Sequence, residues 1–590
     1  MRVGVDTGGT FTDLVSADGR VTKVPSTPDD PASAVASAMR GLAVRALAHG
    51  TTVATNAVLE GLDTVVTLLC TEGLEDIVEI ARQDRPLLYD DSVRRPPPLV
   101  DRDHRIGVSG RFAVDGQVLV ALDTSAADRI PADTEAVAVA LLHSDLDASH
   151  EREIARIVVD SGYDVSCSSA VAPEFREYER TVTTVLNAAL RPVCRRYLSR
   201  VGQMAEETSV MASSGGLLDL DVAAELPAAL LLSGPAGGVG AAADAARLAG
   251  FESAVTFDMG GTSTDVCLVQ DGRPEPAGVR RVAGYEVRFP SLDIHTIGAG
   301  GGSIAWLDAG GAQRVGPQSA GARPGPACYG FGGAEPTVTD ADLVARRIDP
   351  ASHFGGLELS VDAAEDVLRR AGLDAAGVIE VVNANMERAI RSVTIERGVD
   401  PATLALVAFG GAGPLHACDL ADALGMAAVV VPARAGALSA VGLLTAPMRR
   451  EVVRSWRFGA RRAGLDALAS ELAANARLLL PGPSTVVDVA YECRYAGQSH
   501  ELRVGSPDDF DAEHERRNGF SRPGHDVEVI AVRATATRPS PVSSIGLPAT
   551  VARPGGTGPL VISESDCTIW VPEGWRADPD DAGNLVVTRA

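Results

Sequence analysis

The stretch that decides the fold is VGVDTGGTFTDLV, residues 3–15, and a closely similar stretch, VTFDMGGTSTDVCLV, occupies residues 255–269. Both contain Asp-x-Gly-Gly-Thr-x-Thr-Asp between short β-branched runs. The glycines lead back into residues suited to a strand, so each copy predicts a β-hairpin with a glycine turn. Backbone N–H groups in such a turn can close around a phosphate without obstruction by side chains.

The side chains of this motif suit a nucleotide and its metal ion. Threonine hydroxyls can donate to phosphate oxygens, and an aspartate that ends the first strand of each hairpin can hold a hydrated Mg²⁺. Two such hairpins facing each other would grip the phosphates, with the metal between Asp6 and Asp258, which we expect to be catalytic. The residues expected to contact ATP are Gly8, Gly9, Thr10, Thr12, Asp13, Gly260, Gly261, Thr262, Thr264 and Asp265.

The alternative interpretation is that Gly-Gly-Thr marks an ordinary turn. For one copy this explanation is as good as a phosphate site. Two copies that agree at Asp, Gly, Gly, Thr, Thr and Asp disfavour it. Asp13 and Asp265, which close the hairpins, would orient the threonines or contact the metal.

A third glycine-rich segment, AFGGAGPLHACDLADALG (408–425), has a strand before its glycines and a helix after them. Such a turn lets a flat adenine or ribose lie against backbone, and the helix N-terminus favours anions. Alone this signal is weak, but it follows two phosphate hairpins. We expect an adenosine site at Gly410, Gly411 and Gly413.

Two helices rich in small residues are expected at 233–250 (SGPAGGVGAAADAARLAG) and 436–446 (GALSAVGLLTA). Glycine and alanine at this density allow close helix crossing, as at a hinge between domains. Ordinary packing of small residues in a core explains the pattern equally well.

Composition limits the class of protein. The chain has 590 residues, 45% hydrophobic and 22% charged, which predicts a globular protein of three or four domains. Its net charge of −25 argues against nucleic acid or an anionic membrane as main partner. No apolar run approaches the about 18 residues that cross a bilayer, and no signal pattern opens the chain, so we expect a cytoplasmic protein. The eight cysteines are dispersed without a CxxC pair, which predicts reduced thiols.

Lys23 is the only lysine in the chain. A GxxxxGK[ST] P-loop is absent, and Lys23 lies in an ordinary polar context, GRVTKVPS. The sequence therefore disfavours a lysine-dependent phosphate clamp and Schiff-base chemistry.

Alternation of apolar strands with amphipathic segments predicts an α/β fold. Residues 84–112 are expected to form an irregular loop, and valine-rich stretches from about 486 onward indicate a β-rich C-terminal part. Strands are expected at 64–69 and 136–142, and helices at 31–48, 150–162, 174–200, 383–398 and 462–480.

The order of hairpin, small-residue helix, hairpin, adenosine turn and second helix resembles the actin-like ATPase superfamily. In that superfamily two doubly wound domains, each with one hairpin, close over ATP. The fold class implied is α/β, with duplicated doubly wound domains around a nucleotide cleft and a β-rich C-terminal domain. The boundaries we expect are 1–172, 173–455 and 456–590.

Longer motifs resemble the hydantoinase A/oxoprolinase family in particular, over essentially the whole chain. They include HGTTVATNAVLEG (49–61), RQDRPLLYD (82–90), PEFREYERTVTTVLNAALRPV (173–193), PSLDIHTIGAGGGSIAW (290–306), YECRYAGQSHEL (491–502) and VPEGWRADPDDAGNLVV (571–587).

This resemblance implies an ATP-dependent amidohydrolase that phosphorylates the carbonyl oxygen of a hydantoin, 5-oxoproline or another lactam. Phosphorylation gives an activated imidate that opens more readily than the unstrained ring. It also implies a B-type partner subunit and hence a hetero-oligomer. Two alternatives remain: the ATP-using subunit of an acetone- or acetophenone-type carboxylase acting on a ketone, and a nucleotide-driven regulatory ATPase. A sugar kinase fits these motifs less well.

Several polar residues are candidates for the substrate side of the site. His295 is a candidate metal ligand or general base, although a structural histidine explains it equally well. GAGGGS (298–303) is a further glycine turn, and we expect Gly300, Gly301 and Gly302 to contact the nucleotide. Other candidates without an assigned role are His49, Arg82, Asp84, Arg85 and Asp293.

Overall fold

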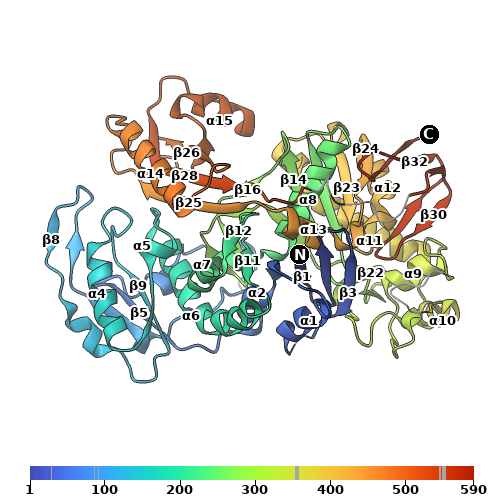
Figure 1. Ribbon diagram of the computed structural model, residues 1–590, viewed down its shortest axis with the longest axis horizontal. Helices are drawn as coiled ribbons and strands as arrows, with labels where there is room; N and C mark the ends of the chain where they lie inside the picture. The colour runs from blue at the N-terminus through green and yellow to red at the C-terminus, as the bar shows by residue number, and fades with distance from the viewer. Residues whose placement is uncertain (28, 85–86, 91, 352–357, 544–546, 548–552) are drawn as a thin grey trace.

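The computed structural model of the chain describes residues 1–590 except 28, 85–86, 91, 352–357, 544–546 and 548–552 (Figure 1). It has a mixed α/β architecture, which confirms the predicted fold class. One 10-stranded sheet and one 9-stranded sheet form the two halves of the molecule. Each half contains one of the two Gly-Gly-Thr motifs.

The same strand order occurs in both halves. In the first sheet the order β3-β2-β1-β4-β11 has β2 antiparallel to β1 and β3, and β1, β4 and β11 parallel. In the second sheet β15-β14-β13-β23-β24 repeats these directions. The first set is β1 (Arg2–Thr7), β2 (Phe11–Ser16), β3 (Val21–Pro25), β4 (Ala46–Thr51) and β11 (Glu207–Met211). The second set is β13 (Ala254–Met259), β14 (Thr264–Gln270), β15 (Arg273–Pro274), β23 (Ala405–Phe409) and β24 (Ala428–Val431).

Two small-residue helices join the halves at the centre of the molecule (Figure 1). Helix α8 (Gly234–Leu248) leads into β13, and α13 (Leu438–Thr445) follows β24 after a short 3₁₀ turn, Ala435–Ala437. A Cβ on Gly442 would lie 1.8 Å from the Gly237 carbonyl oxygen, so the two helices touch backbone to backbone. Helix α13 also packs on β1, where a Cβ on Gly4 would meet the Ala440 oxygen at 2.2 Å. Small residues at these positions are therefore a requirement of the crossing.

A smaller parallel sheet, β10-β9-β5-β6, lies to one side of the first half (Figure 1). Its strands are β5 (Val66–Thr71), β6 (Arg105–Val108), β9 (Ala136–Ala140) and β10 (Asp164–Cys167), with α4 (Ser149–Asp160) beside them. The long helix α6 (Glu177–Gly202) continues through Pro192 and buries Val185, Ala188 and Ala189 against this sheet. Leu186 and Leu190, on another face of α6, join the core of the first half.

The C-terminal strands extend both large sheets. β25 (Met448–Ser455), β26 (Val486–Tyr495), β27 (Leu502–Val504) and β28 (Val527–Arg538) lengthen the first sheet, covered by α14 (Leu465–Leu479). β33 (Leu585–Arg589), β32 (Trp575–Pro579) and β29 (Gly556–Thr557) continue the second sheet beyond β24. The β-rich character expected of this part is confirmed.

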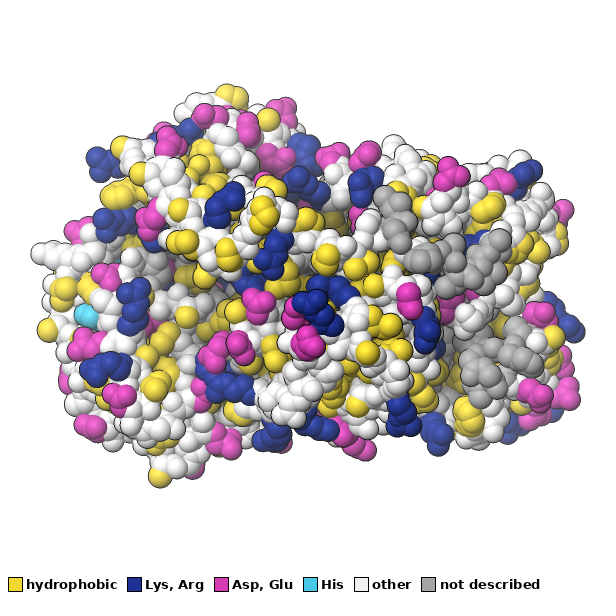
Figure 2. All heavy atoms as spheres, viewed as in Figure 1, with side chains coloured by type: hydrophobic (Ala, Val, Ile, Leu, Met, Phe, Trp, Pro, Cys, Tyr) yellow, Lys and Arg dark blue, Asp and Glu magenta, His cyan; other side chains and the backbone are white. Residues whose placement is uncertain are grey.

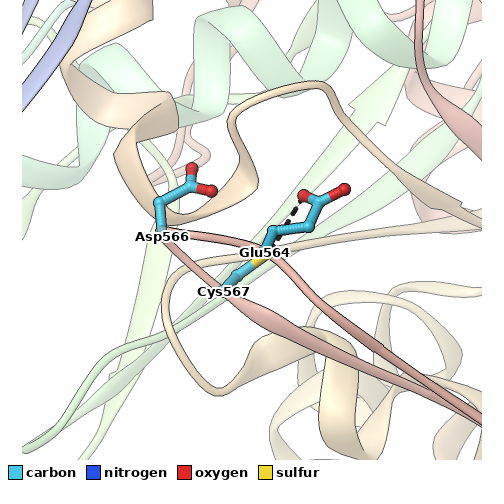
Figure 3. Close-up of side chains that lie close together, drawn as sticks. All are labelled: Glu564, Asp566 and Cys567. Carbon is cyan, nitrogen blue, oxygen red and sulfur yellow. Dashed lines mark hydrogen bonds between the residues drawn. The ribbon is translucent and has the colours of Figure 1, made fainter. Parts of the chain in front are cut away.

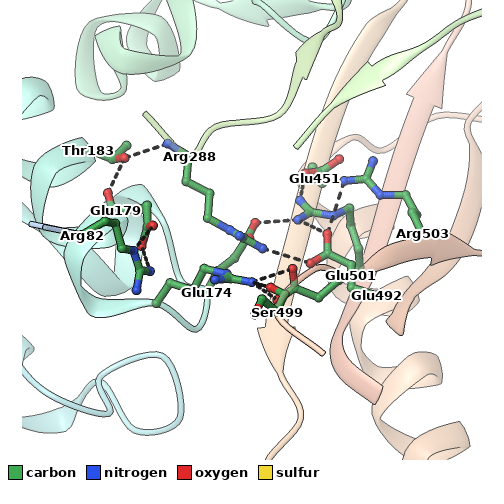
Figure 4. Close-up of polar contacts among 12 residues, drawn as sticks. Arg82, Glu174, Glu179, Thr183, Arg288, Glu451, Glu492, Ser499, Glu501 and Arg503 are labelled. Carbon is green, nitrogen blue, oxygen red and sulfur yellow. Dashed lines mark hydrogen bonds and ion pairs between the residues drawn. The ribbon is translucent and has the colours of Figure 1, made fainter. Parts of the chain in front are cut away.

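A buried ion-pair network attaches the strands of the C-terminal part to the start of α6 (Figure 4). The Glu174 carboxylate accepts from Arg288 Nε at 2.6 Å and from Arg533 Nη2 at 2.5 Å. Arg533 also donates to Glu492 at 2.9 Å and pairs with Glu451. Burial would raise the pKa of Glu174, but Arg533 and Arg288 hold it at about 2. The carboxylate is therefore ionised and ties three remote segments together.

Most of the expected elements are present, with two differences. The helix expected at 31–48 ends early: α1 spans Pro31–Ala38, and Ala46–Thr51 form β4 instead. All six residues of β4 are buried, so this central strand has no alternation to distinguish it from an apolar helix. Residues 84–112 were expected to be irregular but include β6, a half-buried strand at the edge of the smaller sheet.

Surface and thiols agree with the composition. All eight cysteines are free. On the face drawn in Figure 2, arginine and acidic side chains are interspersed. Within the described part of the chain, none of the helices has the length and apolarity needed to span a bilayer.

Candidate functional site

Four aspartates form two cross-strand pairs at the ends of the duplicated hairpins. Asp6 lies directly opposite Asp13 in β1 and β2, and Asp258 lies opposite Asp265 in β13 and β14. Residues directly opposite in an antiparallel pair have their Cβ atoms about 5 Å apart, and like charges there are destabilising. Each hairpin thus holds two carboxylates close together, an arrangement that favours a nearby cation.

The pKa values of these groups report the same excess of negative charge. Burial and then Asp13 raise the pKa of Asp6 to about 7, against the opposing effect of Lys23. Burial, Asp265, Asp6 and Asp13 together raise the pKa of Asp258 well above its ordinary value. Burial raises the pKa of Asp265 to about 6, although a hydrogen bond from Thr296 lowers it. Since the charges of Asp6 and Asp13 raise the pKa of Asp258, the two hairpins form one electrostatic site.

Glycines make room for the two aspartates predicted to bind metal. A Cβ on Gly50, beside Asp6 on β4, would lie 2.7 Å from the Asp6 Oδ1 atom. A Cβ on Gly410, at the end of β23, would lie 2.4 Å from Asp258 Oδ1. The two carboxylates therefore have equivalent surroundings in the two halves. Gly50 was missed by the sequence analysis, although its place in HGTT at the end of a strand was a usable signal.

The tips of the hairpins face one another. Thr10 Oγ1 of the first hairpin lies 3.8 Å from the position of a Cβ on Gly261 in the second. The turns have the same closing bond: Gly8 N–H donates to the Phe11 carbonyl and Gly260 N–H to the Ser263 carbonyl, both at 3.0 Å. The prediction that the chain holds two hairpins of one design is confirmed.

The second threonines of the motifs lie in a different environment from the first. Thr12 and Thr264 are fully buried. Thr12 Oγ1 lies 3.1 Å from Ser26 Oγ, and Thr264 donates to the Ala299 carbonyl at 2.6 Å. Both hydroxyls therefore hold the hairpin to its surroundings. Thr262, like Gly9 and Gly261, is exposed at a hairpin tip.

The glycine turn at 300–302 packs under the second hairpin. Gly301 and Gly302 N–H groups donate to the carbonyls of Gly260 and Gly261 at 3.0 and 2.7 Å, and Gly300 N–H donates to Ser303 Oγ. A Cβ on Gly300 would lie 2.7 Å from the Gly261 carbonyl carbon. These glycines therefore support the second hairpin turn, with their N–H groups engaged.

The expected adenosine turn lies against the same hairpin. Gly410 has φ +77°, and Ala412 N–H donates to the Met259 carbonyl at 3.0 Å. Gly411 is half-buried and Gly413 begins α12 (Gly413–Leu424), whose N-terminus is at this turn. A helix N-terminus beside a carboxylate-lined site suits an anionic ligand that carries its own cation.

Lys23 departs from the expectation of an ordinary polar position. It lies opposite Asp13 on β3, and its Nζ is 2.6 Å from Asp13 Oδ1. The same ammonium lies 3.4 Å from the Gly436 carbonyl at the turn before α13. The occurrence of a single lysine was the signal in the sequence that could have identified this residue.

His295 is not brought to the aspartates. On β20 (Ile294–Ile297), its neighbour Thr296 donates to Asp265 at 2.5 Å. Since side chains alternate along a strand, His295 points to the opposite face. There it lines a cavity of about 370 Å³ with Asn385 and Arg388 of α11 (Ala375–Val393).

The remaining substrate-side candidates have partners inside the protein. Arg82 forms a two-point ion pair with Glu179 (Figure 4), and Asp293 accepts from Arg280 at 3.4 Å. His49 is buried between the Val5 carbonyl at 3.1 Å and the Tyr197 hydroxyl at 2.7 Å, and burial lowers its pKa to about 4. Arg85 lies outside the described residues.

The donor set at the hairpins fits Mg²⁺. It consists of carboxylate oxygens from both halves and lacks soft ligands, as a hard cation prefers. Mg²⁺ usually takes one or two carboxylates and completes its shell with water and substrate phosphates. A divalent ion between Asp6 and Asp258 would also supply the positive charge that the two aspartate pairs favour.

Another acidic group does not have this character. Within the described residues, one group of three potential ligands has donor atoms within 4.8 Å of one another: Glu564, Asp566 and Cys567. Glu564 is already neutralised by Arg553 through two contacts of 2.7 Å, and it accepts from the Cys567 thiol. Asp566 lies to one side of that contact (Figure 3) and accepts from Gly436 N–H at 3.1 Å.

Comparison with known proteins gives matches over the whole chain. Residues 180–452 match the hydantoinase/oxoprolinase family, and residues 2–162 match the hydantoinase/oxoprolinase N-terminal region. The caprolactamase subunit alpha of Pseudomonas jessenii is 33% identical, over 100% of this chain and 99% of its own. The 5-oxoprolinase 1 of Arabidopsis thaliana is 34% identical, over 75% of this chain and 41% of its own. The crystal structure of the ATP-dependent caprolactamase from Pseudomonas jessenii has a TM-score of 0.85 at 31% identity, covering 100% of both chains.

Proposed function

Because the chain belongs to the hydantoinase/oxoprolinase family, we propose that it is the ATP-using subunit of an enzyme that opens a cyclic amide. The observation that carries the proposal is the meeting of the two hairpins, with Thr10 next to Gly261 and paired aspartates behind each turn. The relatives described above are a caprolactamase subunit and a 5-oxoprolinase, which both act on lactams.

In the proposed mechanism the residues at the hairpin tips hold the phosphates of ATP. Backbone N–H groups of Gly9 and Gly261 and the hydroxyls of Thr10 and Thr262 donate to phosphate oxygens from both sides. Asp6 and Asp258 would hold a hydrated Mg²⁺, which when bound would neutralise charge on the transferring phosphoryl group. The Gly410 turn and the α12 N-terminus hold the adenosine end.

The chemistry requires the substrate carbonyl oxygen to approach in line with the γ-phosphate. The amide oxygen attacks the γ-phosphorus and ADP leaves, so the lactam becomes a phosphorylated imidate. Water then adds to the imidate carbon, the ring C–N bond breaks as the nitrogen takes up a proton, and a second water hydrolyses the resulting acyl phosphate to the acid and inorganic phosphate. Because the caprolactamase relative is named as a subunit, we propose that a B-type partner supplies the groups for these hydrolytic steps.

The experiment that tests this proposal is ATP hydrolysis measured with candidate lactams and hydantoins, with and without the co-purified partner. Stimulation of ADP release by a cyclic amide, together with the ring-opened acid as product, would support it. Consumption of ATP that requires bicarbonate and a ketone would instead assign a carboxylase. Slow hydrolysis that responds only to a partner protein would assign a regulatory ATPase.

A further inference from the structure

The only lysine of the chain makes two contacts that connect parts of the candidate site. The Lys23 ammonium lies 2.6 and 2.8 Å from the two Asp13 oxygens and 3.4 Å from the Gly436 carbonyl. The Lys23 side chain is 26% exposed, and its ammonium lies 5.2 Å from the centre of the Phe11 ring. The ammonium thus contacts both the first hairpin and a segment 413 residues further along the chain.

The Gly436 segment is itself attached to the adenosine side. The neighbouring Ala435 carbonyl accepts from Gly410 N–H at 2.9 Å, and Gly436 N–H donates to Asp566 at 3.1 Å. Arg434 donates to the Gly19 carbonyl at 3.2 Å, so the turn between β2 and β3 is held to the same segment. One short 3₁₀ turn therefore joins the first hairpin, the adenosine turn and the start of α13.

Lys23 also changes the charge of the site, because its ammonium neutralises a carboxylate of the first hairpin. Asp13 lies directly opposite Asp6 in the hairpin, and the Lys23 ammonium is bound to both Asp13 oxygens. Without it, Asp13 would be an unneutralised carboxylate directly opposite Asp6. Asp13 would then compete with Asp6 for the metal and repel the phosphates of ATP.

We propose that Lys23 is a positioning residue of the nucleotide site, which neutralises Asp13 and, through Gly436, fixes the first phosphate hairpin relative to the adenosine turn. This assignment rests on the proposed ATPase function. Lys23 touches neither the γ-phosphorus nor the attacking oxygen of the proposed reaction. Its effect is therefore on the geometry and the charge of the site.

The test compares wild type, Lys23→Met, Lys23→Arg and a matched loss of charge, Arg20→Met. Arg20 is an exposed residue in the turn before β3. We expect Lys23→Met to lower kcat for ATP by about 10-fold or more, as for residues that orient ligands from a second layer. Lys23→Arg should keep most of the activity because it keeps the charge, and Arg20→Met should equal wild type.

A second readout separates positioning from a merely structural role. In the absence of nucleotide at pH 8.5, Mn²⁺ binding followed by electron paramagnetic resonance should be tighter in Lys23→Met than in wild type, because a positive charge has left a carboxylate cluster. Loss of a contact that only supports the fold would weaken Mn²⁺ binding, and would overturn the proposal.

Chemical modification covers the case in which Lys23→Met does not fold. An amine-selective acetylating reagent applied to the folded wild-type protein has two targets, Lys23 and the Met1 amine, and peptide mass spectrometry distinguishes them. Activity should fall as Lys23 becomes acetylated, whereas Lys23→Arg treated alike should remain active. Full activity in protein acetylated at Lys23 would refute the role of Lys23. Absence of ATP hydrolysis in untreated wild type would refute the proposed function instead.

Discussion

Thr10 of the first hairpin and Gly261 of the second face each other, with the threonine hydroxyl 3.8 Å from where a Cβ on Gly261 would be. These residues come from opposite halves of the molecule, and Gly261 is exposed. The two tips are therefore close enough for both to touch the same phosphate chain.

A larger side chain at the tip of the second hairpin should weaken nucleotide binding without harming the fold. We expect Gly261→Val to raise KM for MgATP by about 10-fold or more, since the side chain projects where phosphates would bind. The melting temperature should stay near that of wild type. Gly278→Val is the control, because Gly278 is also exposed and its Cβ would meet nothing within 4 Å. Unchanged KM in Gly261→Val would contradict the placement of phosphate between the tips.

Asp258 should be essential for turnover but unfavourable for stability. Asp258→Ala and Asp258→Asn should abolish ATP hydrolysis and leave the fold intact. Both should also raise the unfolding midpoint of the metal-free protein, because they remove one of two like charges directly opposite in a hairpin. Steady-state ATPase assays and thermal unfolding in EDTA measure the two effects. Asp63→Asn, at an exposed loop position, is the matched control, and hydrolysis at the wild-type rate in Asp258→Ala would exclude this site.

Stability of the metal-free protein should fall as pH rises because of Asp6. Its pKa is about 7 when folded and 3.8 ordinarily, so the folded protein binds its proton more tightly. The stability this gives is fully present below pH about 4 and is lost as pH rises to about 7. Urea unfolding of wild type and Asp6→Asn from pH 4 to 8 should show a difference that follows this curve. Mg²⁺ added at pH 8 should restore stability in wild type only, because it binds the ionised carboxylate. A difference independent of pH would contradict the assignment.

Glu174 should have the opposite pH dependence. Its pKa is held at about 2, below the ordinary 4.5, so the stability it contributes is present above pH 4.5 and lost as pH falls toward 2. Glu174→Gln leaves Arg533 buried without one of its carboxylates, and such a loss costs about 3 kcal/mol or more at neutral pH. Urea unfolding at pH 7 and pH 3 tests this, and the cost should be smaller at pH 3. Exposed Glu153→Gln on α4 is the control, and an equal cost at both pH values would argue against the ion-pair network.

Local patterns carried the sequence prediction as far as the hairpins. Asp6, Asp13 and their counterparts were predictable because a glycine turn with fixed spacing determines its own cross-strand register. Residues 46–48, at the start of β4, fell within the expected helix because a fully buried strand lacks alternation. Long-range pairing was out of reach: nothing in residues 527–538 states that β28 joins the sheet of β1.

The polar partners of the site were also beyond local reasoning. Lys23 meets Asp13 across two strands, which register explains, but its contact with Gly436 depends on how α13 returns to β1. The direction of the His295 side chain could not be predicted from its motif. It depends on whether Thr296 or His295 faces Asp265 across the strands. A shift of one residue in that strand would exchange them.

The contact between Gly237 and Gly442 has a consequence for how the halves move. Helices that interlock through large side chains resist rotation, because each row of side chains must leave the groove between rows on the other helix. At this crossing the two helices meet backbone to backbone. One helix can therefore rotate against the other with little change in buried area. The site between the hairpins would then open and close at small energetic cost, and its geometry would be set by the ligand that spans it.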